Sequence, residues 1–278
     1  MNTMLKSLGC AAVVAGAGMG ANVAQADYVS TVLSNEDLIA YYRLGEDPSQ
    51  TSTATDASGS HDGTYHGSPL STMGPTADDG WNSFGDNNSA INLNGAGAIT
   101  LDTAALDIPQ ITFTGWFRLT DDTHNQRIYT TQASPSNRFT INVANGQRLH
   151  VTTGGSNGAW VPIDTVLDGE WHHLVVSRGS NAREDVAVWI DFLPVATTLA
   201  SHFGQGTGTN PTLGAQGVVD GTIDNSFLGS LDEVAFFNRV FTQEDVNELH
   251  AAALIPEPAS LALLGLGGLA MLGRRRRA

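Results

Sequence analysis

Two tryptophans stand in polar, glycine-rich surroundings that suit sugar binding. Trp81 follows Gly80, and Trp160 lies two residues after Gly158. Proteins bind sugars with an exposed aromatic ring and a few polar groups placed around it. Because binding residues are concentrated in loops, we predict that Trp81 and Trp160 contact a ligand. The alternative is that either ring folds back onto the core. The other tryptophans lie in strand-like segments and are predicted to be core residues: Trp116, Trp171 and Trp189.

The remaining reactive residue types lack the spacing that metal binding or catalysis needs. His172 and His173 are adjacent in a strand-like segment, so their side chains point to opposite faces and cannot share one metal ion. Glu184 and Asp185 are also adjacent, so their carboxylates point to opposite faces and cannot act together as the acid and base of a glycosidase. The chain has no His-Glu-x-x-His motif, and its single cysteine is Cys10. We therefore predict that the protein is not an enzyme.

The segments that must position these residues read as short strands. Alternation of apolar and polar residues predicts strands at residues 38–44, 90–93, 98–101, 111–119, 138–143, 148–152, 170–177, 185–191 and 227–238. Asn94-Gly95 and Asn145-Gly146 are typical hairpin dipeptides and predict turns between strand neighbours. Many short strands with a single helix predict an all-β fold, an antiparallel β-sandwich.

One helix and one long loop complete the predicted domain. The helix covers residues 242–252, with Thr242 as its N-cap. Val246, Leu249 and Ala253 form an apolar stripe at helical spacing, which predicts packing onto the sandwich. Residues 45–89 are rich in Gly, Ser, Thr and Asp, and predict a long loop with at most one short strand, at residues 64–66.

The N-terminus is typical of a secretory signal peptide. Lys6 precedes an apolar stretch at residues 8–19, and Ala24 and Ala26 form an Ala-x-Ala cleavage site before Asp27. The signal peptide is therefore predicted to cover residues 1–26. Its removal would leave a chain without cysteine, so the exported domain must rely on its core, on a bound ion, or on both.

The C-terminus combines a short motif, an apolar stretch and a positive cluster. Pro256, Glu257 and Pro258 precede the apolar residues 259–273, and four arginines follow at 274–277. As a helix the apolar stretch is about 22 Å long, shorter than the roughly 30 Å of a hydrocarbon core. The arginines are expected to stay in the cytoplasm, with the preceding domain across the membrane. An ordinary C-terminal membrane anchor is the alternative.

The order of these C-terminal parts resembles the PEP-CTERM sorting signal of Gram-negative bacteria. This resemblance implies that an exosortase in the inner membrane recognises the Pro-Glu-Pro motif and removes the tail. It also implies delivery of residues 27–255 to the cell surface or the extracellular matrix. The membrane would then be contacted only by residues 256–278, before processing.

The composition excludes a nucleic-acid partner. The chain has 28 acidic and 13 basic residues among its 278, a formal net charge of −15. Without the two targeting segments, eight arginines and no lysine stand against 27 acidic residues, a net charge of −19. Such a surface repels polyanions and favours cations. Residues 27–255 are enough for one domain with its own core.

Five segments in their usual order carry a second resemblance. They are residues 38–44, an Asp-x-Ser-Gly loop at 56–59, residues 112–117, a Trp-His-His strand at 168–176, and residues 229–242. Together they resemble the laminin-G-like, concanavalin A-like lectin/glucanase domains, which implies a jelly roll of two curved antiparallel sheets. One departure lies after Asp191, where Phe192 replaces the usual glycine. Because phenylalanine is strained at positive φ, we expect a different turn there.

The same resemblance implies functions and a metal site. Related domains often hold a structural calcium ion, here between Asp56 and Asp232, with carbonyl groups of Gly63 and Thr64 completing the shell. Alternatively, Asp56 caps a turn and Asp232 is a solvated strand residue. The Glu-x-Asp-x-x-Glu strand pattern of related glucanases is absent. We predict binding of carbohydrate or a matrix exopolysaccharide; a divergent polysaccharide hydrolase or lyase and a protein–protein adhesion module are the alternatives.

Overall fold

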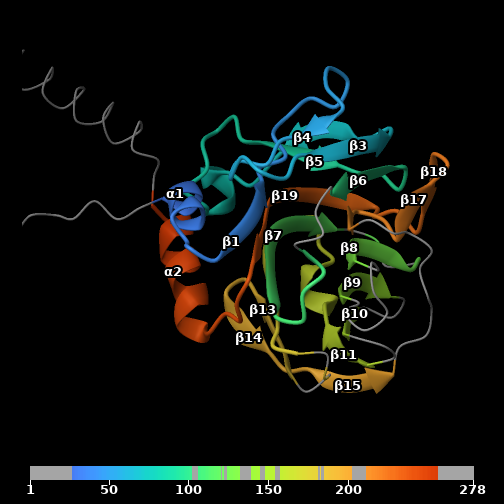
Figure 1. Cartoon of the computed structure of the whole chain (residues 1–278). Helices are drawn as coiled ribbons and strands as arrows, with labels where there is room; N and C mark the ends of the chain where they lie inside the picture. Colours follow the sequence, from blue (N-terminus) through green and yellow to red (C-terminus); the bar gives the residue numbers. More distant parts are fainter. Residues whose placement is uncertain are drawn as a thin grey trace, which may run out of the picture.

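The computed structural model in Figure 1 describes the central part of the chain. The described residues are 27–101, 106–119, 121, 124–131, 139–144, 148–153, 157–180, 182, 185–201 and 211–255. Ala26 of the predicted cleavage site and the predicted sorting motif of Pro256, Glu257 and Pro258 lie outside them. Among the described residues, no helix is long and apolar enough to span a bilayer.

The first sheet has eight antiparallel strands. Their order is β14-β13-β12-β7-β19-β5-β4, and β1 also pairs with β19. The strands are β1 (Leu38–Tyr42), β4 (Leu70–Met73), β5 (Ser89–Asn92), β7 (Ile111–Leu119), β12 (Trp171–Arg178), β13 (Val186–Ile190), β14 (Leu193–Val195) and β19 (Gly229–Phe237). The long central strands β7 and β19 pair along nearly their whole length.

The second sheet has nine strands in the order β15-β11-β10-β9-β8-β16-β6-β3-β2. They are β2 (Thr53–Ala54), β3 (Gly63–Gly67), β6 (Gly97–Leu101), β8 (Gln126–Thr131), β9 (Phe139–Ala144), β10 (Arg148–Thr153), β11 (Asn157–Pro162), β15 (Thr198–Ser201) and β16 (Thr212–Leu213). A separate hairpin is formed by β17 (Gly217–Val219) and β18 (Thr222–Asp224). Short 3-10 helices cover Ala77–Asp79 and Asp164–Val166.

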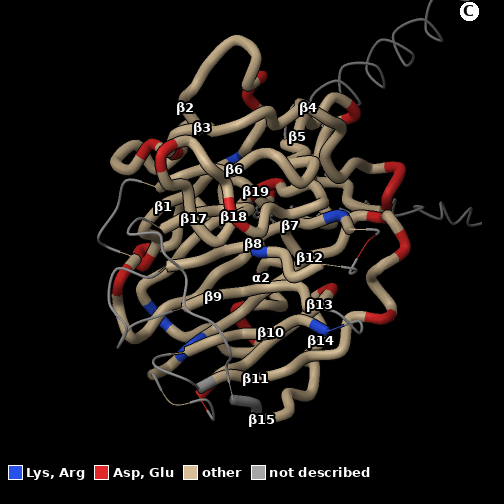
Figure 2. Tube along the Cα trace, turned by 90° about the vertical axis from the view of Figure 1, so that its right-hand side faces the viewer, with Lys and Arg blue, Asp and Glu red and all other residues tan. Residues whose placement is uncertain are grey.

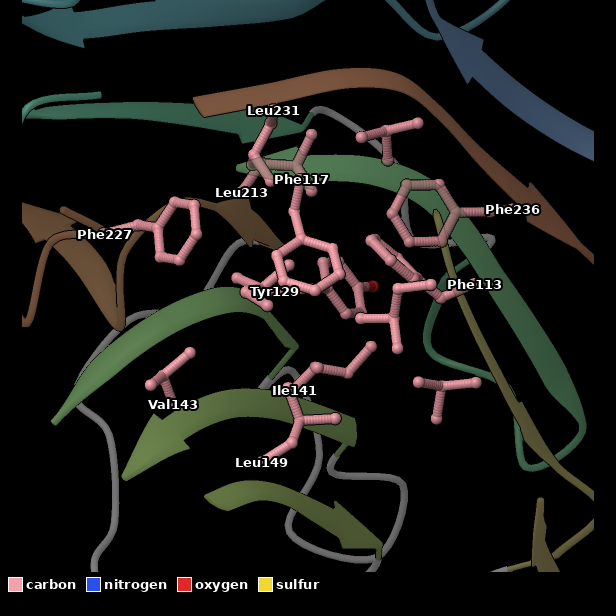
Figure 3. Packing of buried hydrophobic residues seen from close by; sticks show 14 of the residues in the cluster. Phe113, Phe117, Tyr129, Ile141, Val143, Leu149, Leu213, Phe227, Leu231 and Phe236 are labelled. Atoms are coloured by element: carbon pink, nitrogen blue, oxygen red, sulfur yellow. The ribbon is translucent and has the colours of Figure 1, made fainter. Parts of the chain in front are cut away.

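A large apolar core lies between the two sheets. Figure 3 shows rings from both sides meeting there, among them Phe113 and Phe236 of the first sheet and Tyr129 of the second. Phe113 and Phe236 pack edge to face with ring centroids 5.6 Å apart, and Phe236 lies 4.8 Å from Tyr129. Side chains alternate along each strand, so these apolar residues point into the core and the residues between them point outward.

A second core lies on the outer face of the eight-stranded sheet. It is covered by the helices α1 (Tyr28–Leu33) and α2 (Gln243–Ala253), which Figure 1 shows side by side at one edge of the molecule. Trp116 is fully buried there beneath Tyr28. His173 Nε2 and the Tyr28 hydroxyl form a hydrogen bond of 2.9 Å. Burial lowers the pKa of His173 to about 3. The first described helix and the last are therefore tied to one sheet through the same cluster.

The predicted sandwich and helix are confirmed. Helix α2 has a complete capping box, in which Thr242 and Asp245 exchange hydrogen bonds. Its predicted stripe is buried at Val246, Leu249 and Ala253. Of the segment predicted as one long loop, residues 45–89, parts instead form β2, β3, β4, the start of β5 and a 3-10 helix. These strands are short and largely polar, so periodicity did not reveal them.

Two predicted turns differ from expectation. Asn94 and Gly95 do adopt positive φ angles of 50° and 66°, but β5 and β6 on either side belong to different sheets, so no hairpin forms. Phe192 keeps a positive φ of 66° despite its side chain. Its ring is buried and stacks between His173 at 4.3 Å and His250 at 4.5 Å, which offsets the backbone strain.

Two glycines with similar backbone angles separate strain from crowding. Gly214 has φ +74° and its Cβ position meets the Leu93 side chain, whereas Gly221 has φ +78° with open space around it. We expect Gly221→Ala to cost about 1 kcal/mol, the strain of a left-handed residue. Gly214→Ala should cost about 1–3 kcal/mol more, because Leu93 must move. Urea unfolding of both variants measures the difference, and equal losses would contradict this packing.

Candidate functional site

Asp56 is a cap for its own loop. Its Oδ1 accepts hydrogen bonds from the backbone N–H groups of Tyr41 (2.8 Å) and Ser58 (2.9 Å). Its Oδ2 accepts from Ser60 (3.1 Å) and His61 (2.9 Å), and the Ser58 hydroxyl contacts both oxygens. The carboxylate is buried with its lone pairs already used. This is the turn-capping alternative to metal binding, and Asp56 does not fit a calcium ligand.

The four predicted calcium ligands are not brought together. Asp56 bridges to β1, and β1 lies between it and β19, which carries Asp232. Gly63 and Thr64 lie in β3 with neighbours on both sides, β2 and β6, so their carbonyl groups point along the ladders of the sheet. Asp56, Gly63 and Thr64 are therefore engaged in structural contacts away from Asp232.

Asp232 is buried and only partly satisfied. Its Oδ2 accepts a hydrogen bond of 2.8 Å from the Asn88 side chain, and its Oδ1 has no hydrogen-bond partner in the part of the chain that the structure describes. Burial raises the pKa of Asp232 well above its ordinary value, although Asn88 and Arg43 act in the opposite direction. The sequence alternative of a solvated strand residue is thus wrong. An orphaned buried carboxylate oxygen fits one ligand of a cation.

An open polar cavity lies beside Asp232. It has a volume of about 570 Å³ and is lined by Arg43, Glu46, Asp86, Asn88 and their neighbours. Glu46 accepts hydrogen bonds from the backbone of Thr55 and from the Tyr65 hydroxyl, which fix its carboxylate in the wall. Within the described residues, no group of three or more His, Cys, Asp or Glu side chains is arranged to hold a metal ion. Any cation here would depend on amide, carbonyl and water oxygens as well.

Trp81 belongs to the second core rather than to a binding loop. It is half-buried, with its ring 4.7 Å from Trp116 and 5.7 Å from Phe192. The ring therefore folds back onto the sandwich, as the alternative reading of the sequence allowed.

Trp160 lies on strand β11, not in a loop, and is one of five residues that form a row across neighbouring strands. Register places Arg127, Asn142, His150, Trp160 and Thr198 directly opposite one another on β8, β9, β10, β11 and β15. Their side chains share the outer face of the nine-stranded sheet, because the intervening residues point into the core. Figure 2 views these five strands as they run one below another. We call these five residues the polar row.

The polar row passes from buried to exposed. Arg127, Asn142 and His150 are buried, Trp160 is half-buried and Thr198 is exposed. The rings of Trp160 and His150 stack at 4.2 Å with an angle of 21°. Gly158 makes this possible, because a methyl group there would lie 2.6 Å from His150 Nε2. The guanidinium of Arg148 lies 5.8 Å from the Trp160 ring.

Some polar atoms of the row have no partner among the described residues. Arg127 Nη1 and Asn142 Oδ1 are buried without a hydrogen bond there, and so is Oγ1 of Thr130 on the same face. Burial lowers the pKa of Arg127 to about 10, and its Nη2 donates to Gln216 at 3.1 Å. Sequence reasoning missed these residues. The alternation of Thr and Asn with apolar residues at 139–144 was the available signal, since it marks an outer face that is polar yet not charged.

The adjacent histidines have separate roles, as their spacing predicted. His173 lies in the second core, while His172 is half-buried at the start of β12. His172 contacts Asp191 through Nδ1 at 2.8 Å and Asp168 through Nε2 at 3.0 Å. Burial alone would lower the pKa of His172, but hydrogen bonds to these two carboxylates and their charges raise it.

Comparison with protein families agrees with this architecture. The family described as Concanavalin A-like lectin/glucanases superfamily matches residues 93–247. The chain belongs to this superfamily. The PEP-CTERM protein-sorting motif matches residues 254–277 and is the mark of a protein exported by Gram-negative bacteria. No curated protein matches the sequence.

Solved structures of the same fold come from several kinds of protein. Domain 4 of a GH43 extracellular arabinanase from Geobacillus stearothermophilus, in complex with arabinotriose, has a TM-score of 0.52 at 20% identity, covering 77% of this chain and 98% of that one. Trypanosoma rangeli sialidase in complex with sialic acid has a TM-score of 0.55 at 11% identity, covering 78% and 33%. The receptor-binding domain of botulinum neurotoxin type G has a TM-score of 0.50 at 13% identity, covering 77% and 51%.

These likenesses show the fold alone. This superfamily member spans about a third of the sialidase chain and half of the neurotoxin domain. The polar row and the cavity beside Asp232 must therefore be interpreted from their own residues.

The contacts of His172 predict a pH-dependent stability. Because its pKa is raised in the folded state, its contribution is fully present below pH about 6.5, the unfolded value, and is lost as pH rises through the folded pKa. We expect His172→Gln to lose about 1 kcal/mol at pH 5 and less at pH 8. Urea unfolding at both pH values measures this, and a loss that grows with pH would contradict it.

Proposed function

We propose that this exported protein binds carbohydrate without catalysis, through the outer face of its nine-stranded sheet. The polar row carries the proposal. It combines an aromatic ring with amide, guanidinium and hydroxyl groups in one line across five strands. Because neighbouring strands are about 4.8 Å apart, Trp160 and Thr198 at the accessible end of the row are spaced to contact an extended saccharide that crosses β11 and β15.

Each member of the row suits a different part of a sugar. The half-buried Trp160 ring, held in place by stacking on His150, can pack against the apolar face of a pyranose or furanose. Arg127 Nη1 and Asn142 Oδ1 are a donor and an acceptor without a partner among the described residues, and because both are buried a sugar hydroxyl group would reach them only if neighbouring side chains move. Ring and polar groups are fixed by the sheet, so little ordering is needed on binding.

The buried carboxylates support binding rather than hydrolysis. Glu233 contacts Tyr41 and Arg43, and the lone pairs of Asp56 are taken by its loop. A glycosidase needs a pair of carboxylates flanking an accessible bond. The polar row contains no carboxylate. A polysaccharide hydrolase or lyase remains the rival reading, and an adhesion module for proteins is the third.

The sorting signal supports a location for this binding outside the inner membrane. We propose that an exosortase processes the Pro256-Glu257-Pro258 segment and that residues 27–255 then reside at the cell surface or in the extracellular matrix. There the protein would bind an exopolysaccharide.

Trp160 is the residue whose removal should matter most. We expect Trp160→Ala to weaken binding of a neutral polysaccharide at least tenfold, about 1.4 kcal/mol, because the stacking surface is lost. Trp160→Phe should retain part of the affinity. Affinity gels cast with arabinan, xylan or mannan measure the retardation of the chain. The fold of each variant is checked by its melting temperature.

Three outcomes would contradict the proposal. Unretarded migration of the wild type in every gel would remove the carbohydrate ligand. Equal retardation of Trp160→Ala would remove the row as its site. Release of reducing sugar by the wild type would replace binding with hydrolysis.

We also propose a structural calcium ion at Asp232. Its orphaned Oδ1, the neighbouring Asn88 side chain and the carboxylates of the adjoining cavity support this placement. When bound, the ion would neutralise the buried carboxylate and tie β19 to the loop that carries Asn88. This differs from the ligand set suggested by sequence, since Asp56, Gly63 and Thr64 are engaged elsewhere.

Calcium should therefore raise the melting temperature of the chain. At 100 times its dissociation constant an ion adds about 2.7 kcal/mol, or roughly 5–10 °C for a domain of this size. Asp232→Asn should lose this response. Asp56→Asn is the matched control, which should lower stability yet keep the calcium response. An unchanged melting temperature after chelation would contradict the site.

A further inference from the structure

Arg118 is a half-buried arginine without a carboxylate partner among the described residues, as is the exposed Arg148, but only Arg118 also lines a cavity with its guanidinium tied by a hydrogen bond. Arg43 pairs with Glu233, and Arg239 pairs with Asp37 and Asp245. No described carboxylate lies within ion-pair distance of Arg118, in a chain with more than twice as many acidic as basic residues. Its charge is therefore available to an external anion.

The guanidinium of Arg118 is held in a fixed position. It lies over the Trp171 ring, 5.0 Å from the centroid, and its Nη2 donates to Thr72 Oγ1 at 3.1 Å. Thr72 lies on β4, which is separated from β7 in the sheet by β19 and β5. Ser230 of β19 is the cross-strand neighbour of Arg118. Two contacts thus restrain a normally flexible side chain, while Nε and Nη1 make no hydrogen bond with a described residue.

A cavity of about 350 Å³ opens beside this guanidinium. Asn92, Asn94, Asp121 and Ser230 line it together with Arg118. Register explains the arrangement: Trp171, Arg118, Ser230 and Asn92 are cross-strand neighbours on β12, β7, β19 and β5. They share the outer face of the eight-stranded sheet, on the opposite side of the sandwich from the polar row.

We propose that this cavity binds a uronic-acid residue of an acidic saccharide. A carboxylate is planar and matches the two free N–H directions of a guanidinium. The amides of Asn92 and Asn94 offer donors and acceptors for the ring hydroxyls. The volume is at the lower end of ligand pockets, which suits one or two sugar units rather than a protein segment. This site does not depend on the polar row.

Digalacturonate is the probe, and its dimethyl ester is the uncharged control. Calorimetric titration of the full chain in mild detergent should give binding of the acid, with the ester at least tenfold weaker. Arg118→Gln should weaken the acid at least tenfold. Arg118→Lys should also weaken it, because the charge stays while the planar fork and the stacking on Trp171 are lost.

Two further variants guard against trivial explanations. Asn94→Gly removes an amide from an exposed residue whose φ of 50° glycine accepts, and should weaken digalacturonate several-fold without unfolding. Arg148→Gln removes an equal charge, also near a tryptophan, from the other face and should change the affinity less than twofold. In affinity gels, neutral polysaccharides should retard Arg118→Gln as much as the wild type. The test of the uronic-acid cavity and the test of the polar row can therefore give opposite results.

The proposal is overturned by any of four results. They are no binding of digalacturonate, equal affinity for its ester, unchanged affinity in Arg118→Gln, and equal affinity for acetyl-diglycine. The last would mean that any carboxylate suffices, including the C-terminus of a protein.

Discussion

Two consecutive buried carboxylates in β19 are the constraint on which the rest of the fold depends. Asp232 and Glu233 are fully buried, and Glu233 takes a positive φ of 49° where the register with β7 shifts. Leaving such a charge unpaired costs several kcal/mol, so the neighbouring groups are not optional. Tyr41 and Arg43 satisfy Glu233, and Asn88 satisfies one oxygen of Asp232. The segments that carry these partners, β1 and the loop before β5, are thereby fixed against β19.

The register shift between Asp232 and Ala235 is a β-bulge, and it divides β19 into two halves whose side chains face different parts of the structure. Before it, Ser230 faces the cavity of Arg118, and after it Ala235 and Phe237 face the helices. Without the extra residue, alternation would send one of these halves to the wrong face. The same strand therefore supplies the base of a polar cavity and the base of an aromatic core. The nine-stranded sheet achieves a similar division by alternation alone, with apolar residues inward and the polar row outward.

Features that depend on neighbouring residues in the sequence were predicted, whereas features that depend on contacts between distant residues were not. Helix α2 was predicted with its cap and stripe because both signals are local, and the sandwich followed from alternation. The fate of Phe192 was not predictable, since its positive φ is offset by rings from β12 and α2 that are distant in sequence. Trp160 was assigned to a loop because its neighbours are polar and glycine-rich. Gly158, one of these neighbours, instead lies on the same strand and leaves room for the His150 ring on the adjacent strand β10.

The strong negative charge of the chain does not oppose an acidic ligand at Arg118. Figure 2 shows acidic residues spread around the loops, with few basic ones between them, so the repulsion comes from many scattered charges. At physiological ionic strength such repulsion is screened over about 8 Å, whereas a guanidinium in direct contact with a carboxylate is not. Added salt would therefore relieve the long-range repulsion before it weakens the contact. An acidic surface in which Arg118 is preorganised and has no carboxylate partner among the described residues thus rejects polyanions in general while accepting a carboxylate that fits the cavity.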